Sequence, residues 1–134
     1  MSVYVTDTHP LIFQATERAE RLGRRARRIF TDAENGKHSV IVPIVVIEET
    51  VRLVEKRVVK LTVTFRRWAE ELDRSPNFHI QAYTIGIFFE AIALRAIRDP
   101  ADRVIVATAR HLGHPLITAD EVIQNGDWVE TIWD

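Results

Sequence analysis

Short apolar runs alternate with longer segments of helical periodicity in this sequence, and this alternation restricts the fold more than any other feature. Residues 3–5, 39–42, 78–83, 116–117 and 128–133 are mostly apolar and rich in β-branched or aromatic side chains, so we predict them to be strands. Runs this short and this apolar are typical of the buried strands of a parallel sheet.

Apolar residues recur at three- and four-residue spacing between these runs, which predicts helices. The predicted helical segments are residues 11–15, 22–35, 44–56, 61–73, 85–97 and 101–112. Pro10 and Pro100 fit the first turns of helices, whereas Gly36 and Gly113 end them. The segment 85–97 is apolar nearly all round, which indicates a buried helix. The order βααβααβααβαβ predicts an α/β fold, a three-layer α/β/α sandwich around a mostly parallel sheet of four to five strands.

The length of 134 residues predicts one domain, spanning residues 1–134, that buries a core without disulfides. The sequence contains no cysteine, which excludes disulfide frameworks, thiolate nucleophiles and cysteine zinc sites. A net charge of −1 gives no global attraction for nucleic acid. No stretch has the apolar length of a membrane span, and the N-terminus lacks the pattern of a secretory signal, so we expect a cytoplasmic protein.

Acidic residues stand shortly after the predicted strands and at one helix start. They are Asp7, Glu49 or its neighbour Glu48, Asp102 with Asp99, and Asp120. Each alone fits a helix cap, a solvated helix face or a turn. Together they are expected to converge, because the carboxyl ends of parallel strands meet at one edge of the sheet. Converging carboxylates repel one another and need a cation, and oxygen ligands suit Mg²⁺ or Mn²⁺, which support phosphodiester hydrolysis.

Four segments carry a resemblance to a known family. They read Thr-Asp-Thr-His-Pro-Leu-Ile at residues 6–12, Pro-Ile-Val-Val-Ile-Glu-Glu at 43–49, Asp-Pro-Ala-Asp-Arg-Val-Ile-Val-Ala-Thr-Ala at 99–109 and Leu-Ile-Thr-Ala-Asp at 116–120. In this order they resemble the acidic motifs of PIN-domain proteins, especially the VapC-type toxins of toxin–antitoxin modules. The resemblance implies an endoribonuclease that hydrolyses RNA with water activated by Mg²⁺ or Mn²⁺. It also implies neutralisation by a small antitoxin protein and, often, a dimer.

The resemblance assigns roles to the four acids. Asp7 and Asp102 correspond to direct metal ligands, and Asp120 to a fourth acid that acts through water or a second ion. Glu49 corresponds to the family's glutamate because it stands six residues after Pro43. The alternative places this role one residue earlier in the chain.

Further residues are expected to support these acids. Thr6 and Thr118 would orient them, and Asp99 would cap the helix that it begins. Arg103 would hold the scissile phosphate, or it would pair with Asp99 or Glu49.

Arginines gather in residues 18–28 and allow two interpretations. They are Arg18, Arg21, Arg24, Arg25, Arg27 and Arg28. They would line an RNA path, because phosphate contacts favour arginine, or they would form the solvated outer face of an amphipathic helix. The second interpretation is favoured, since Glu17 and Glu20 lie nearby.

Two other functions fit the same pattern. One is a PIN-like domain that binds RNA or a protein partner without cutting, and the other is a phosphatase on a different α/β fold. The presence of all four acids favours the nuclease, because a purely binding domain has no use for a cluster of like charges. We also expect a homodimer, because the apolar helices around residues 44–59 and 85–97 offer more apolar surface than one small sheet covers.

Overall fold

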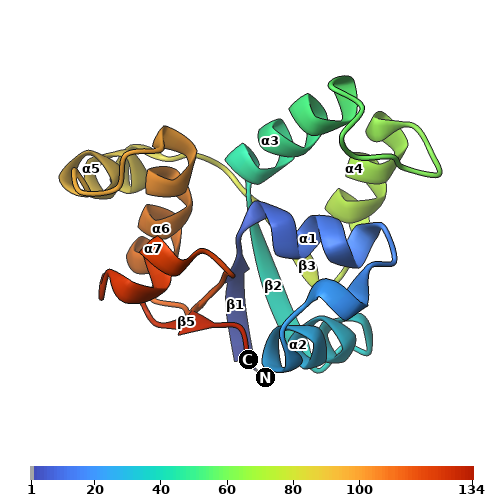
Figure 1. Cartoon of the computed structure of the whole chain (residues 1–134), viewed down its shortest axis with the longest axis horizontal. Helices are drawn as coiled ribbons and strands as arrows, with labels where there is room; N and C mark the ends of the chain where they lie inside the picture. Colours follow the sequence, from blue (N-terminus) through green and yellow to red (C-terminus); the bar gives the residue numbers. More distant parts are fainter. Residues whose placement is uncertain (1) are drawn as a thin grey trace.

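The computed structural model describes residues 2–134, and within them a five-stranded parallel sheet forms the centre of the molecule (Figure 1). The strands are β1 (Ser2–Thr6), β2 (His38–Pro43), β3 (Phe78–Gln81), β4 (Leu116–Ile117) and β5 (Thr131–Ile132). Their order in the sheet is β3-β2-β1-β4-β5, so β1 is central. Val5 of β1 lies opposite Ile41 on one side and Leu116 on the other. The predicted parallel sheet is confirmed.

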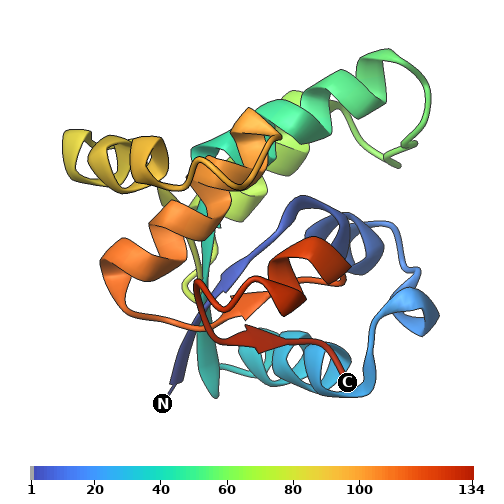
Figure 2. The same ribbon diagram turned by 60° about the vertical axis from the view of Figure 1, so that its left-hand side comes forward.

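Helices connect the strands and lie on both sides of the sheet. They are α1 (Thr8–Ala15), the 3-10 helix η1 (Ala19–Arg21), α2 (Arg24–Glu34), α3 (Ile44–Glu55), α4 (Phe65–Arg74), α5 (Ile85–Ala93), α6 (Pro100–Leu112) and α7 (Glu121–Asn125). Two views show α6 against one side of the sheet and α2 against the other (Figure 1 and Figure 2). The predicted α/β/α sandwich is therefore confirmed. No helix in residues 2–134 combines the length and the apolar character needed to cross a membrane.

The core is built from the strands and from the helix faces that cover them. Val5 and Leu116 are fully buried in adjacent strands, and Phe30 of α2 stacks on Phe78 of β3 with ring centroids 6.4 Å apart. In α6 every residue of the run 104–109 is buried, because this helix packs against the sheet, α3 and α5. Burying each large apolar side chain contributes roughly 1.5–3 kcal/mol, so this core fixes the positions at which the strands end.

The helix predicted for residues 61–73 begins later than its apolar pattern suggests. α4 starts at Phe65, because the Thr64 hydroxyl accepts a hydrogen bond from the backbone N–H of Arg67 at 3.2 Å and caps the helix. The β-branched residues that precede Thr64 disfavour a helix. Residues 56–64 therefore form an irregular connection after α3.

Other predicted bounds differ by a few residues. The strand predicted for residues 78–83 ends at Gln81, and the one predicted for 128–133 is reduced to Thr131–Ile132. The helix predicted for residues 22–35 begins at Arg24, and the helix predicted for 11–15 already begins at Thr8.

The prediction that the segment 85–97 forms a buried helix is wrong. α5 ends at Ala93, and only Ile87 and Ala91, on its α6 side, are buried. The large side chains on its other face are 42–68% exposed: Ile85, Phe88, Phe89 and Ile92. Apolar composition shows how well a helix could be buried, but it does not show whether another element covers it.

Candidate metal centre

The acids predicted from sequence follow the carboxyl ends of the strands or begin a helix beside them. Asp7 is the N-cap of α1 directly after β1, and Asp120 is the N-cap of α7 shortly after β4. Glu49 lies in the second turn of α3, which begins where β2 ends, and Asp102 lies in the first turn of α6. Since all strands are parallel, these positions gather at one edge of the sheet.

Asp7 is the most deeply buried of these acids, with 8% of its surface exposed. The Thr118 hydroxyl donates to Asp7 Oδ2 at 2.7 Å, and the backbone N–H of Thr8 donates to Oδ1 at 2.8 Å. Burial raises the pKa of the Asp7 carboxyl, and the two hydrogen bonds oppose part of this rise because they favour the charged form. The orientation of the carboxylate is therefore fixed on both oxygens.

Glu48 and Glu49 face different surroundings on α3. Glu49 is half-buried, and its Oε1 accepts a hydrogen bond from the Thr8 hydroxyl. Burial raises the pKa of Glu49, and the bond from Thr8 opposes part of the rise. Glu48 is exposed and pairs with Arg52 at 3.4 Å along the same helix. Of the two alternatives left by the sequence, the structure turns Glu49 toward the acidic edge.

The pKa of Asp102 shows that the acids act on one another. It is raised to about 7, first by burial and then by the negative charges of Asp7, Asp99, Asp120 and Glu49. Charges at long range in water would have little effect, so these carboxylates share a local environment. The cap predicted for Asp99 is present, because its Oδ1 accepts from the backbone N–H of Asp102 at 3.1 Å.

Two threonines connect the strand ends to the acids in different ways. The buried Thr118 hydroxyl donates to Asp7 and accepts from the backbone N–H of Asp120 at 3.1 Å, so it joins two of the acids. The Thr6 hydroxyl donates to the backbone carbonyl of Asp7 at 2.9 Å and therefore supports the backbone rather than the carboxylate.

Arg103 makes neither of the acidic pairs considered from the sequence. Its guanidinium donates to the backbone carbonyl of Ile97 and, at 3.3 Å, to that of Arg95. These carbonyls belong to the connection between α5 and α6, so the side chain folds back over this connection. Asp102 and Arg103 are adjacent in the chain, but on a helix their side chains point about 100° apart.

Sequence reasoning gave no role to two residues that lie at this edge. Thr8 uses its backbone N–H for Asp7 and its hydroxyl for Glu49, so one residue holds two of the acids. His9 lies close enough for its charge to act on Asp7 and Glu49. The available signal was position, since both residues follow Asp7 at the start of a helix.

The donors at this edge are carboxylate and hydroxyl oxygens, which suit Mg²⁺ or Mn²⁺. In the part of the chain that the structure describes, no group of three or more histidine, aspartate or glutamate side chains lies close enough together to hold a metal ion. The carboxylates nevertheless lie near enough to Asp102 for their charges to raise its pKa. Mg²⁺ keeps several waters and takes few protein ligands together with substrate phosphates, so its binding does not require such a group. The carboxylates that would hold such an ion are those expected from the sequence: Asp7, Glu49, Asp102 and Asp120.

Comparison with known families identifies the family of the chain. The sequence matches the PIN domain family over residues 4–129. The chain belongs to the PIN domain family. The match contains all the acids described above, so the family predicted from the four acidic segments is confirmed.

Solved structures share the fold of this PIN domain along nearly its whole length. VapBC2 from Rickettsia felis, bound to a DNA fragment from its promoter, is 15% identical with a TM-score of 0.69, and the match covers 98% of this chain and 99% of that one. DNA-bound VapBC from Salmonella typhimurium is also 15% identical with a TM-score of 0.69, and the match covers 98% of both chains. A toxin–antitoxin complex from Klebsiella pneumoniae is 18% identical with a TM-score of 0.64, covering 98% of this PIN domain and 96% of that chain. A search of curated proteins finds no significant match.

Proposed function

We propose that this PIN domain is a Mg²⁺- or Mn²⁺-dependent endoribonuclease and the toxin of a toxin–antitoxin pair. The observation that carries the proposal is the mutual effect of the acids, most visible in Asp102, whose pKa burial and four neighbouring carboxylates raise to about 7. A cluster of like charges lowers stability unless a cation offsets the repulsion. A domain that only bound RNA or protein would gain nothing from it, so the cluster supports catalysis over binding alone.

The structure supports a division of roles among the acids. A divalent ion held here would activate water for attack on a phosphodiester and offset negative charge on the phosphoryl oxygens. Asp7 would be the most rigid ligand, because Thr118 and Thr8 fix its two oxygens and each oxygen keeps a further lone pair. Glu49, held by the Thr8 hydroxyl, would approach from α3, and Asp102 would approach from α6.

A cleavage assay tests this proposal. The purified protein is incubated with RNA in Mn²⁺ or in EDTA, and we expect shortened RNA only with Mn²⁺. Asp7→Asn and Asp102→Asn should abolish cleavage and leave the circular dichroism spectrum unchanged, because each removes a ligand charge but keeps the shape. Asp73→Asn, at an exposed position on α4, is the matched control and should cut like wild type. Cleavage in EDTA, or full activity of both site variants, would contradict the metal site, and release of inorganic phosphate without shortening would indicate a phosphatase.

A small antitoxin is the proposed protein partner. The support is that the structural neighbours include a toxin–antitoxin complex that matches this chain over 98% of its length. A short reading frame beside the gene is the first candidate. We expect its product to co-purify with this chain and to suppress RNA cleavage, whereas a product that neither binds nor inhibits would count against this pairing.

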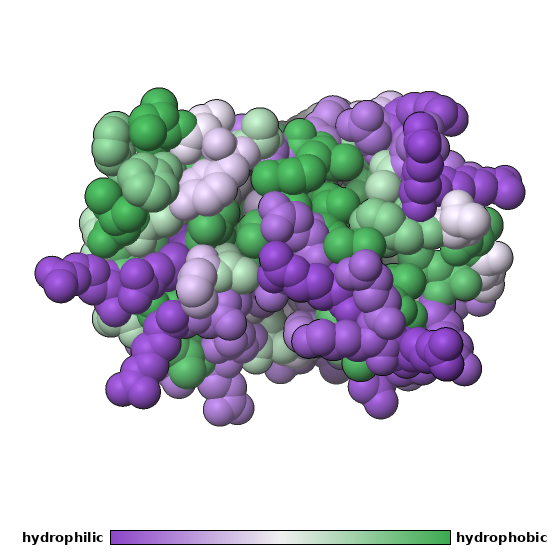
Figure 3. Space-filling view, turned by 90° about the horizontal axis from the view of Figure 1, so that it is seen from above, coloured by the Kyte–Doolittle hydropathy of each residue, from purple (hydrophilic) through white to green (hydrophobic). Residues whose placement is uncertain are grey.

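A second copy of the chain is the proposed occupant of the exposed face of α5. Figure 3 views the molecule from above and shows apolar residues gathered at the left end of the molecule, where α5 lies. The face consists of Ile85, Phe88, Phe89 and Ile92, with Tyr83 beside it. Contiguous apolar side chains of this kind are typical of protein interfaces, and the homodimer expected from the sequence would cover them.

A further inference from the structure

A hollow of about 520 Å³ lies between α1 with η1 on one side and the end of α3 with its following connection on the other. These two segments face each other at the right of Figure 2. Apolar side chains line part of the hollow: Ile12, Phe13, Leu53, Val58 and Val59. Four cations line the rest: Arg18, Arg21, Arg57 and Lys60. Apolar and cationic walls in one hollow suit a ligand that carries both flat apolar rings and negative charges.

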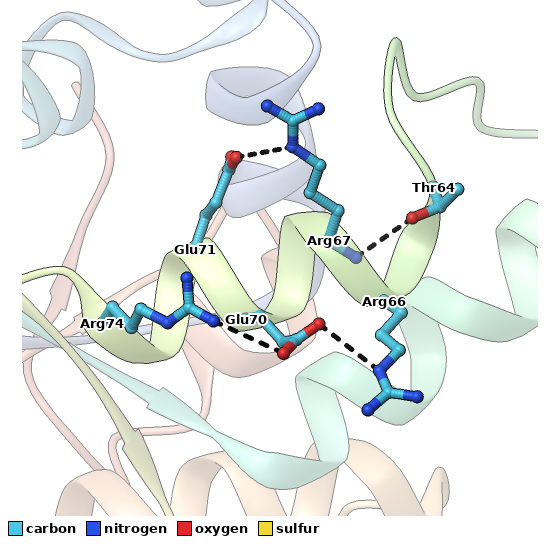
Figure 4. Close-up of polar contacts among 6 residues, drawn as sticks. All are labelled: Thr64, Arg66, Arg67, Glu70, Glu71 and Arg74. Atoms are coloured by element: carbon cyan, nitrogen blue, oxygen red, sulfur yellow. Dashed lines mark hydrogen bonds and ion pairs between the residues drawn. The ribbon is translucent and has the colours of Figure 1, made fainter.

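These four cations are not neutralised by the protein. In residues 2–134 no carboxylate lies within 4.0 Å of any of their charged groups, whereas the arginines of α4 are paired. Arg66 and Arg74 both contact Glu70, and Arg67 contacts Glu71, as Figure 4 shows. The Arg21 guanidinium lies 5.8 Å from the centre of the Phe13 ring, so one cation is held against the apolar wall. The positive charge around the hollow is therefore available to a ligand.

Arg57 follows the C-cap of α3, and its backbone N–H donates to the Val54 carbonyl at 3.0 Å. Its φ of +62° lies in the left-handed region, where a side chain with a Cβ costs roughly 1–2 kcal/mol relative to glycine. This conformation commonly ends a helix, and glycine adopts it most easily, so Arg57 can be replaced by glycine without strain.

The hollow adjoins the acidic edge. His9 lines the hollow and also lies near enough to Asp7 and Glu49 for its charge to act on both. α1 carries residues of both regions, since it begins directly after Asp7 and contributes Ile12 and Phe13 to the hollow. A chain seated in the hollow would therefore continue toward the acids.

We propose that this hollow binds single-stranded RNA beside the acidic edge. The backbone phosphates would contact the four cations, Arg18, Arg21, Arg57 and Lys60, and a base would lie against the apolar wall. The inference rests on the nuclease function proposed above and adds to it the route of the substrate. Single strands combine phosphates that bind cations with bases that stack on apolar and aromatic side chains, which matches the two kinds of wall. An acidic peptide would match the cations but would not need a wall for planar rings.

The test measures binding apart from cleavage. Fluorescence anisotropy of a labelled oligouridine 12-mer is recorded in EDTA at several salt concentrations, for wild type and for the triple variant Arg18→Gln, Arg21→Gln, Lys60→Gln. We expect the triple variant to bind at least about tenfold more weakly at low salt. The slope of log affinity against log salt should fall by roughly 2, since each phosphate contact to a single strand contributes about 0.7. The matched control removes three paired arginines of α4, as Arg66→Gln, Arg67→Gln, Arg74→Gln, and should bind within about twofold of wild type.

Two further variants distinguish RNA binding in the hollow from an effect on the stability of the fold. Arg57→Gly should unfold at the same temperature as wild type or higher, because it relieves the left-handed residue, and yet bind RNA several-fold more weakly. Phe13→Ala should weaken binding of oligouridine but not of an abasic strand of the same length, because only the former has bases to stack.

Each outcome bears on one proposal. If the α4 control weakens RNA binding as much as the triple variant does, net charge alone matters. If the triple variant binds RNA as wild type does, the hollow is not the route of the RNA. Either result overturns the proposal that RNA binds in the hollow. If the triple variant loses binding to an acidic peptide but still binds RNA as wild type does, the proposal is also overturned and the hollow is assigned to a protein partner. The nuclease proposal fails separately, when wild type leaves RNA uncut in Mn²⁺ even though RNA binds in the groove.

Discussion

Glu48 and Glu49 are neighbours in the chain, but only Glu49 is turned toward Asp7 and Thr8. Glu49→Gln should lower the rate of RNA cleavage by roughly two orders of magnitude or more, because the proposed ligand would lose its charge and the transition state a few kcal/mol of stabilisation. Glu48→Gln removes the same charge from a solvent-exposed position that pairs with Arg52. It should cut like wild type, and the opposite ranking in a side-by-side cleavage assay would place the ligand one residue earlier.

Asp102 should make the metal-free protein less stable as the pH rises. In the folded protein its pKa is about 7, raised from an ordinary value of 3.8 first by burial and then by neighbouring charges. The folded state therefore binds a proton that the unfolded chain has lost, so stability from this group is full below about pH 3.8 and is lost as the pH rises through about 7. In EDTA, melting curves from pH 4 to 8 should decline less steeply for Asp102→Asn, which has no proton to release.

Bound metal should change the relative stability of wild type and Asp102→Asn. In EDTA at pH 8 the variant should be more stable than wild type by about 1 kcal/mol, a value kept small because Asp102 is half-exposed. With saturating Mn²⁺ the difference should narrow or change sign, because wild type gains RT ln(1 + [L]/Kd) from an ion that the variant binds poorly. Equal stabilisation of both proteins by Mn²⁺ would mean that Asp102 is not a ligand.

At the scale of elements, Thr118 joins the ends of β4 and β1 through its bond to Asp7. Thr118→Val keeps the volume but removes the hydroxyl, so the buried Asp7 oxygen loses a donor. We expect a loss of about 1–3 kcal/mol in the free energy of unfolding and a 10- to 100-fold loss of cleavage. Thr118→Ser restores the hydroxyl and should recover most of the cleavage rate, whereas if Thr118 served stability alone, Thr118→Val would lower the free energy of unfolding without lowering the cleavage rate of the folded protein.

The sequence predicted the acidic edge because the edge depends on topology. Asp7 and Asp120 follow short buried strands, and parallel strands end together, so their approach required no knowledge of side-chain positions. The choice between Glu48 and Glu49 depends on the rotation of α3 about its axis, which the core sets and a local pattern does not. The backbone contacts of Arg103 depend on the path of the connection before α6, which has no periodicity to read.

The elements that were mispredicted have two different causes. The pattern of α5 shows that it is apolar, but whether it is buried depends on how many elements pack around it. The start of α4 was set by a single hydroxyl cap at Thr64, which outweighed the apolar spacing before it. Local sequence therefore predicted the kind of element correctly, while the tertiary neighbours and caps decided its limits and exposure.

At the scale of the whole molecule, the exposed face of α5 makes the association state testable. Phe89→Glu places a charge in the middle of this face and should convert a dimer to a monomer in light scattering, because the buried charge would lack a partner. Val122→Glu alters a side chain of similar exposure on α7 and should leave the mass unchanged. A wild-type mass of one chain across micromolar concentrations would contradict the dimer.

The hydrogen bond between Thr118 and Asp7 spans 111 residues, and this separation governs when the acidic edge exists during synthesis. A ribosome makes β1 first, but the hydroxyl that fixes Asp7 follows 111 residues later, directly after β4, which pairs with β1. Contacts so distant in sequence form late, because closing long loops is slow. A nascent chain that has been made through β3 but not yet through β4 therefore holds Asp7 without the hydroxyl that orients it.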